Sequence, residues 1–127
     1  MNRILLSTLF YILLVQNGFS EWKSIVQNKG YKDTYYIDTQ SIRKFDNKVL
    51  WWELRDGPIP ISKKYFSTLH YMEGDCNYFR HKILSQTWLT GRMGVGRRKN
   101  NENVNSKWVY PSPKSTGSVI LNYVCRQ

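Results

Sequence analysis

Residues 48–54, with the sequence KVLWWEL, decide the fold of this chain. Successive side chains of a strand point to opposite faces, so the apolar residues from Leu50 to Leu54 at even positions share one face. Trp51 and its odd-numbered neighbours then share the other face. Because both faces carry large side chains, we predict the strongest strand of the sequence here.

Strand-like patterns also occur on both sides of this segment. They cover residues 21–27, 34–38, 39–45, 64–72 and 78–89, and turn signals rich in Gly, Asn, Asp and Pro separate them. Residues 78–89 are long for a strand and place three basic side chains beside apolar ones, so a helix remains an alternative there. We favour a strand, and we expect an antiparallel sheet of about five to six strands.

The last third of the chain loses the alternating strand pattern and is first glycine-rich, then polar, and finally helical in its spacing of apolar residues. The glycines of residues 91–96 predict a loop, with a short last strand as an option, and residues 97–106 are too polar to bury much surface, which predicts a mobile loop. Beyond Pro113, apolar residues recur at the spacing of one helical stripe: Val119, Ile120, Tyr123 and Val124. Ser112 or Ser115 is available as N-cap. The fold class is therefore α+β, with a C-terminal helix packed on one face of the sheet.

The two cysteines, Cys76 and Cys125, are predicted to pair. Cys76 follows a predicted strand, and Cys125 lies in the last turn of the predicted helix, so a disulfide would tie the helix to the sheet. Closing a loop of about 50 residues is worth roughly 4 kcal/mol in the chain-entropy model. A redox-active pair would usually show C-x-x-C spacing, which is absent from this sequence.

The first twenty residues have the pattern of a secretory signal peptide. Arg3 precedes an apolar stretch at 4–15, and Gly18 and Ser20 are the small residues of a cleavage site. The apolar stretch is shorter than the about 20 residues that a spanning helix needs, so no transmembrane segment is predicted. We expect residues 21–127 to form one exported domain, located in the periplasm, at the outer surface or in the medium. No cysteine follows the apolar stretch directly, so no lipid anchor is expected.

The chain is strongly basic, with 19 Lys and Arg against 9 Asp and Glu and a net charge of +10. The predicted signal contains one arginine and no acidic residue, so the exported part keeps a net charge of +9. The densest cluster contains Arg97, Arg98 and Lys99, with Arg92 nearby, and it is a candidate surface for acidic proteins or other polyanions. A solvated loop is the alternative interpretation.

Trp51 is a second candidate contact residue, provided that Leu50, Trp52 and Leu54 face the core and leave Trp51 outward. Packing beneath the helix or within a dimer interface is the alternative.

Two histidines, His70 and His81, lie near Glu73 and Asp75 around a predicted turn. Their spacing matches no common metal motif, so neither a metal site nor a cofactor is predicted. The composition alone would also permit a secreted nuclease or other hydrolase that uses both histidines as acid and base.

Several short motifs occur in a distinctive order along the exported part. They are Trp22, Tyr35–Asp38 with Ser41 and Ile42, Val49 with Trp52, Tyr71 and Glu73 with Asp75 and Cys76, Met93 and Gly94 with Gly96, Trp108, Pro111, Ser115, and Val124 with Cys125. In this order they resemble the surface-adhesin protein E-like domains of Gram-negative bacteria. The resemblance implies an antiparallel sheet with a C-terminal helix tied to one face by a disulfide between Cys76 and Cys125.

The same resemblance implies binding without catalysis, with host extracellular-matrix or serum proteins as partners and a homodimer as an option. Our leading hypothesis is an exported, adhesin-like protein that contacts acidic macromolecules through a basic, aromatic surface, with no specific nucleic-acid partner. A periplasmic protein that binds a small ligand or the envelope is the alternative, and the hydrolase is the third hypothesis.

Overall fold

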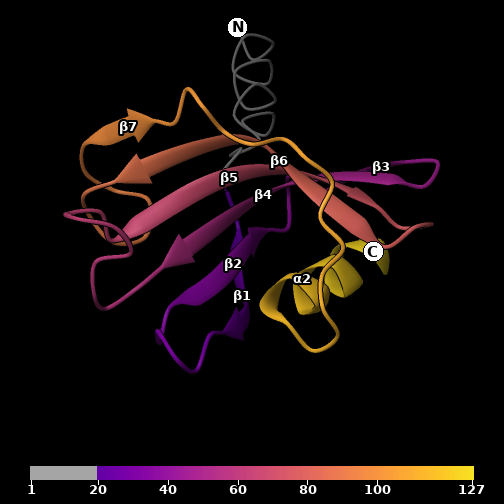
Figure 1. Cartoon of the computed structure of the whole chain (residues 1–127), viewed down its shortest axis with the longest axis horizontal. Coiled ribbons are helices and arrows are strands. Elements are labelled where there is room, and N and C mark those ends of the chain that lie inside the picture. Colours follow the sequence, from indigo (N-terminus) through magenta and orange to yellow (C-terminus); the bar gives the residue numbers. More distant parts are fainter. Residues whose placement is uncertain (1–19) are drawn as a thin grey trace, which may run out of the picture.

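The computed structural model describes residues 20–127, so the predicted signal peptide lies outside the described residues except for Ser20. The elements are β1 (Trp22–Gln27), β2 (Thr34–Asp38), β3 (Arg43–Phe45), β4 (Lys48–Asp56), β5 (Ser67–Asp75), β6 (Arg80–Leu89), β7 (Arg98–Asn100) and α2 (Thr116–Cys125). The seven strands form one sheet in the order β1-β2-β4-β5-β6-β7, and β3 pairs with β4 as well. All of the pairs are antiparallel, which confirms the predicted fold class. Figure 1 shows α2 below one face of this sheet.

The sheet has one more strand than expected, because β7 lies within the segment predicted to be a mobile loop. Arg98–Asn100 pair with Thr87–Leu89, so the prediction of a loop over all of 97–106 is wrong at these three residues. Their side chains are all exposed. An edge strand needs only backbone hydrogen bonds to its neighbour, so a purely polar sequence can form one without burying apolar surface.

β5 begins and ends three residues later than the predicted strand at 64–72. A tight turn brings Tyr65 N to Ser62 O at 2.8 Å, and this turn delays the start of the strand. The turn predicted near Glu73 and Asp75 is displaced as well, because Gly74 lies inside β5. A Cβ atom at this position would approach Leu121 Cδ1 to 2.8 Å and Val49 Cγ1 to 2.9 Å, so glycine lets the helix pack directly on the strand.

α2 begins where the sequence predicted it, with Ser115 as N-cap. The hydroxyl of Ser115 accepts a hydrogen bond from Ser118 N at 3.2 Å and so satisfies one free amide of the first turn. Ile120 and Val124 of the predicted apolar stripe are buried against the sheet together with Leu121, whereas Val119 is 37% exposed, so the prediction was wrong for Val119. This core contains Ile37, Val49, Trp51, Met72, Ile120, Leu121 and Val124.

Trp51 does not face outward. Its side chain is only 1% exposed because α2 covers its face of β4, so packing beneath the helix is what the structure shows. Its neighbour Trp52 lies on the opposite face, is 37% exposed and stacks on Tyr71 with ring centroids 4.8 Å apart. The premise that Trp52 faces the core was therefore wrong, although Leu54 is fully buried on that same face.

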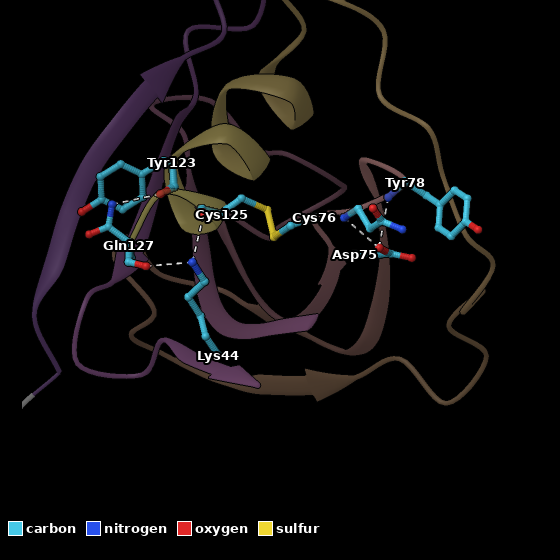
Figure 2. The surroundings of a disulfide bond; sticks show 8 residues. Lys44, Asp75, Cys76, Tyr78, Tyr123, Cys125 and Gln127 are labelled. Carbon is cyan, nitrogen blue, oxygen red and sulfur yellow. Dashed lines mark hydrogen bonds between the residues drawn. A yellow bond between two sulfur atoms is a disulfide. The ribbon is translucent and has the colours of Figure 1, made fainter. Parts of the chain in front are cut away.

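The predicted disulfide between Cys76 and Cys125 is present, with Cα atoms 5.7 Å apart and a sequence separation of 49 (Figure 2). It joins the last residue of α2 to the residue that follows β5. The end of the helix is also held by Lys44, whose Nζ donates to Cys125 O at 2.9 Å and to Gln127 O at 2.7 Å. The helix is thus tied to the sheet at its carboxyl end.

Asp75 organises the turn next to this disulfide (Figure 2). Its Oδ1 accepts from Asn77 N at 3.0 Å and Tyr78 N at 3.1 Å, and its Oδ2 accepts from Arg80 Nε at 3.0 Å. The backbone hydrogen bond from Tyr78, together with Arg80 and Asn77, lowers the pKa of the Asp75 carboxyl below its ordinary value. The turn therefore depends on an ionised Asp75.

Candidate functional site

A cavity of about 410 Å³ lies on the helix side of the sheet, next to the first turn of α2. Strands β4, β5 and β6 contribute Trp51, Glu53, His70, Met72, His81 and Ile83 to its walls, and β2 contributes Tyr35. The opposite wall is the segment from Val109 to Gly117, which runs from the β6 side of the sheet to the start of the helix (Figure 1). Most of the lining is apolar or aromatic, and a few polar groups converge on it.

Glu53 is the acidic group of this cavity and is only 5% exposed. Its Oε2 accepts a hydrogen bond from the indole Nε1 of Trp51 at 3.0 Å. Its Oε1 lies 3.4 Å from Nδ1 of His70, which is itself buried. The carboxylate is therefore held in a fixed orientation by two neighbouring side chains, which leaves further acceptor positions on its oxygens.

A chain of hydrogen bonds fixes the protonation state of His70. Asn103 N, which can only donate, bonds to Asn101 Oδ1 at 3.0 Å, so the Asn101 amide must point its Nδ2 toward Gln86 Oε1, 2.8 Å away. Gln86 then presents its Nε2, also a donor, to His70 Nε2 at 3.0 Å. His70 Nε2 must accept, so the ring is neutral, carries its hydrogen on Nδ1 and donates it to Glu53.

The second histidine of the cavity, His81, has no such partner. Its Nδ1 is buried and makes no hydrogen bond within residues 20–127. Burial lowers the pKa of His81 below its ordinary value of 6.5, and the nearby Glu53 charge offsets this only in part. Burial also raises the pKa of the Tyr35 hydroxyl on the same wall. The cavity therefore holds a neutral His81 with a free ring nitrogen.

The predicted basic cluster divides into two parts in the structure. Arg97, Arg98 and Lys99 are exposed at β7, and none of them lies within 4 Å of a carboxylate in the described part of the chain. Arg92 instead pairs with the buried Asp56 at 2.8 Å. Its guanidinium holds the loop after β6 in place, so much of its charge is already compensated.

A second cluster of cationic and aromatic side chains, which the sequence analysis missed, lies beside β6, and its two cations pair with Asp75 and Glu73. The Trp108 ring has Arg80 Cζ at 4.3 Å and Lys82 Nζ at 4.4 Å from its centroid. Arg80 also lies over the ring of Tyr78 at 5.1 Å. We call these four residues the Trp108 cluster. Strand alternation puts residues 80 and 82 on one face, but no local pattern connects them to a tryptophan so distant in sequence.

The structure also places the two histidines that the sequence analysis considered for a metal site or for catalysis. His70 and His81 both line the cavity, so the structure brings together the two histidines of the hydrolase hypothesis. Within residues 20–127, no three His, Cys, Asp or Glu side chains converge as metal ligands would. No helix in this described part is long and apolar enough to cross a membrane.

Comparisons with known proteins agree with this architecture. The model of a family described as "Surface-adhesin protein E" matches residues 22–126. A crystal form II structure of Haemophilus influenzae protein E superposes with a TM-score of 0.67 at 18% identity, covering 87% of this chain and 91% of that one. A second structure of the same protein gives a TM-score of 0.62 at 17% identity, covering 87% of each chain. At such identities the likeness shows the fold. No curated protein sequence matches the chain.

Proposed function

Because this chain belongs to the surface-adhesin protein E family, we propose that it is an exported, adhesin-like binding domain that acts without catalysis. Its partners in this proposal are acidic macromolecules, host matrix or serum proteins among them. The exported domain would comprise residues 21–127, after removal of the predicted signal peptide. Family membership supports the adhesin-like role, and the charge distribution of the described residues supports acidic partners.

The observation that carries the proposal is the unpaired positive charge at β7. Arg97, Arg98 and Lys99 are fully available to a partner, since no carboxylate of the described chain neutralises them. The net charge of +9 on the exported part adds a long-range field of the same sign. Such a field steers acidic partners toward the protein and raises the association rate more than it lengthens the lifetime of the complex.

The Trp108 cluster would supply the short-range contacts. Aromatic and arginine side chains dominate the binding energy of many protein interfaces, because they combine large contact area with directional hydrogen bonding. Tyr78 and Tyr110 are well exposed beside Trp108 and Arg80. In this proposal β7 attracts the partner, and the Trp108 cluster retains it.

A charge-removal experiment tests the proposal. The mature protein is passed over immobilised basement-membrane matrix and over an immobilised acidic plasma-protein fraction, at about 0.01 M and about 0.15 M salt, where the Debye lengths are about 30 Å and about 8 Å. We expect binding that weakens with salt. The triple substitution Arg97→Ser, Arg98→Ser and Lys99→Ser should lower the association rate at low salt by at least about tenfold and flatten the salt dependence.

The matched control removes three other exposed cations, Lys29→Ser, Lys64→Ser and Arg126→Ser, which changes the net charge equally. This control should bind nearly as well as the unchanged protein. Equal losses in the two triple variants would show that only total charge matters and would contradict a role for β7. Binding that does not respond to salt would contradict an electrostatic surface altogether.

Location is tested separately. Protease treatment of intact cells, compared with osmotic-shock fractions and culture medium, shows where the mature chain resides. Our proposal expects it to be protease-accessible at the surface or released. A chain confined to the periplasm would rule out contact with host proteins.

A further inference from the structure

The cavity beside α2 shares only its rim residue Tyr110 with the surface contacts proposed above, and it contains a buried acid. Glu53 is held by Trp51 and His70, and both of these groups donate without carrying a positive charge, since His70 is fixed in its neutral form by Gln86. No lysine or arginine of residues 20–127 lies within 4 Å of its carboxylate. A buried carboxylate without a cation is costly for a folded protein, so a cationic ligand would find an unmatched charge here.

The walls around Glu53 suit an organic cation rather than a metal ion. Tyr35, Trp51 and Tyr110 line the same cavity, and the face of an aromatic ring attracts an ammonium group within about 6 Å. Met72, Ile83 and Ile120 provide apolar contact for a carbon skeleton. The volume of about 410 Å³ lies in the range that small-molecule sites occupy.

His81 adds a second acceptor. Its ring is neutral, and its Nδ1 is buried without a partner. A neutral imidazole carries its hydrogen on one ring nitrogen, and in the tautomer with the hydrogen on Nε2 the Nδ1 atom can accept an N–H bond, while Glu53 retains free acceptor positions as well. An ammonium group offers up to three N–H donors from one atom, so it suits Glu53 together with His81 in this tautomer.

We propose that this cavity binds a small organic ammonium compound, with the ammonium group hydrogen-bonded to Glu53 and His81 and lying against the aromatic rings of Tyr35 and Trp51. The ligand enters past the rim formed by Val109 and Tyr110, both of which are exposed. The inference is distinct from the surface proposal, because Glu53 and His81 lie on the opposite face of the sheet from Arg80 and Lys82, and the ligand has the opposite sign of charge; the two proposals share only Tyr110.

Salt separates the two proposals experimentally. The basic surface repels a cation at long range, whereas Glu53 attracts it only at contact and from a buried position. Raising the salt therefore screens the repulsion more than the attraction. We expect amine binding to hold or strengthen with salt, while binding of acidic macromolecules weakens.

The test is a titration of isotope-labelled, oxidised mature protein, followed by NMR through its amide resonances. Three probes of similar shape are compared: 2-phenylethylamine, which is a cation at neutral pH, the alcohol 2-phenylethanol, and the anion 3-phenylpropionate. The amine should shift amides around the cavity and bind at least about tenfold more tightly than the alcohol, a difference of about 1.4 kcal/mol. The anion should bind weakest.

Two variants and one control locate the site. Glu53→Gln keeps the shape and removes the charge, so it should lower amine affinity by about tenfold and leave the alcohol unchanged. Tyr110→Ala removes a rim side chain that is 63% exposed and that also accepts a hydrogen bond from Arg80 Nη1; it should keep the fold and weaken amine binding about threefold, within the range for an exposed cation–π contact. The control is Glu73→Gln, on the opposite face of the sheet where Lys48 and Lys82 pair with it; it should bind like the unchanged protein.

Three results would overturn the proposal. The first is equal binding of amine and alcohol, which would make the cavity merely apolar. The second is full amine affinity in a folded Glu53→Gln protein. The third is a folded, unchanged protein whose cavity amides shift with none of the three probes.

Discussion

The two ends of one sheet face differ sharply in what they bury. Trp51 and Glu53 lie two residues apart on β4 and point to the same side, as do Met72 and His70 on β5. Trp51 and Met72 belong to the core beneath α2, whereas Glu53 and His70 lie beyond it as a hydrogen-bonded pair. Whether α2 covers a position therefore determines if an apolar or a polar side chain is buried there, as much as strand alternation determines the face on which the side chain lies.

The helix-covered end is apolar and buried. Val49, Leu121 and Val124 are completely buried there, and the disulfide fixes the helix at its carboxyl end. Burying apolar side chains contributes about 25 cal/mol for each Å² removed from water, so this end is where the fold gains its stability. The polar end is held together by directional hydrogen bonds, each of which adds only about 1 kcal/mol in net terms.

The disulfide should give the largest effect. Replacing both cysteines, Cys76→Ser with Cys125→Ser, should lower the free energy of unfolding by about 4 kcal/mol, because the unfolded chain regains the freedom of a loop of about 50 residues. Urea unfolding of the double variant measures this. A loss below about 1 kcal/mol would mean that α2 is held by its apolar stripe alone.

The contact between α2 and β5 should give the second largest loss in the free energy of unfolding. Leu121→Ala should cost about 3 kcal/mol, and Gly74→Ala about 2 kcal/mol, because the new methyl group would press on Leu121 Cδ1. The two effects should add only in part, since shortening Leu121 relieves the contact with its Cδ1, while Val49 Cγ1 remains 2.9 Å from the position of the new methyl group. A double-mutant cycle measures the coupling, and strict additivity would contradict this direct contact.

The polar end should respond less. Gln86→Leu removes the donor to His70 Nε2 and the acceptor of Asn101, which should cost about 1 kcal/mol and free the His70 tautomer. Nitrogen-detected NMR of the histidine ring reports the tautomer directly. A His70 ring that keeps its hydrogen on Nδ1 in this variant would show that Glu53 alone fixes it.

The smallest effect is a dependence on pH. Burial lowers the pKa of His81 in the folded protein, so as pH falls through the ordinary value of 6.5 the unfolded chain takes up the proton first. Stability is therefore full above 6.5 and declines until pH reaches the lowered pKa. Urea unfolding at pH 7 and pH 5.5 should show a smaller decline in His81→Gln than in the unchanged protein. Identical declines in the two would contradict a neutral, buried His81.

Much of this arrangement could be predicted from the sequence. Alternation identified β4, the helical spacing identified α2 with Ser115 as one of two N-cap candidates, and the two cysteines indicated how the helix is tied to the sheet. The buried face of α2 contains Leu121 in place of Val119 of the predicted stripe. The side on which α2 lies could not be predicted, because both faces of 48–54 carry tryptophan. Trp51 was therefore a candidate surface residue until the fold placed it in the core.

The arrangement of Glu53, His70 and Gln86 at the polar end could not be predicted for a different reason. A register shift between Tyr71 and Met72 in the pairing of β5 with β6 places Ile83 opposite Met72, yet Ser85 opposite Tyr71. Simple alternation along β6 is thereby broken, and Gln86 reaches the same face as His81. Contacts such as Arg92 with Asp56 and Gln86 with Asn101 also join residues that no local pattern connects.

We infer that the helix-covered end of the sheet face stabilises the protein and that the polar end binds a ligand. Urea unfolding and 2-phenylethylamine affinity, measured together on Leu121→Ala and Glu53→Gln, test this division most directly. We predict that Leu121→Ala loses about 3 kcal/mol of stability and keeps its affinity, whereas Glu53→Gln stays within about 1.5 kcal/mol of the unchanged protein and binds about tenfold more weakly. Stability and affinity that fall together in both variants would contradict the claim.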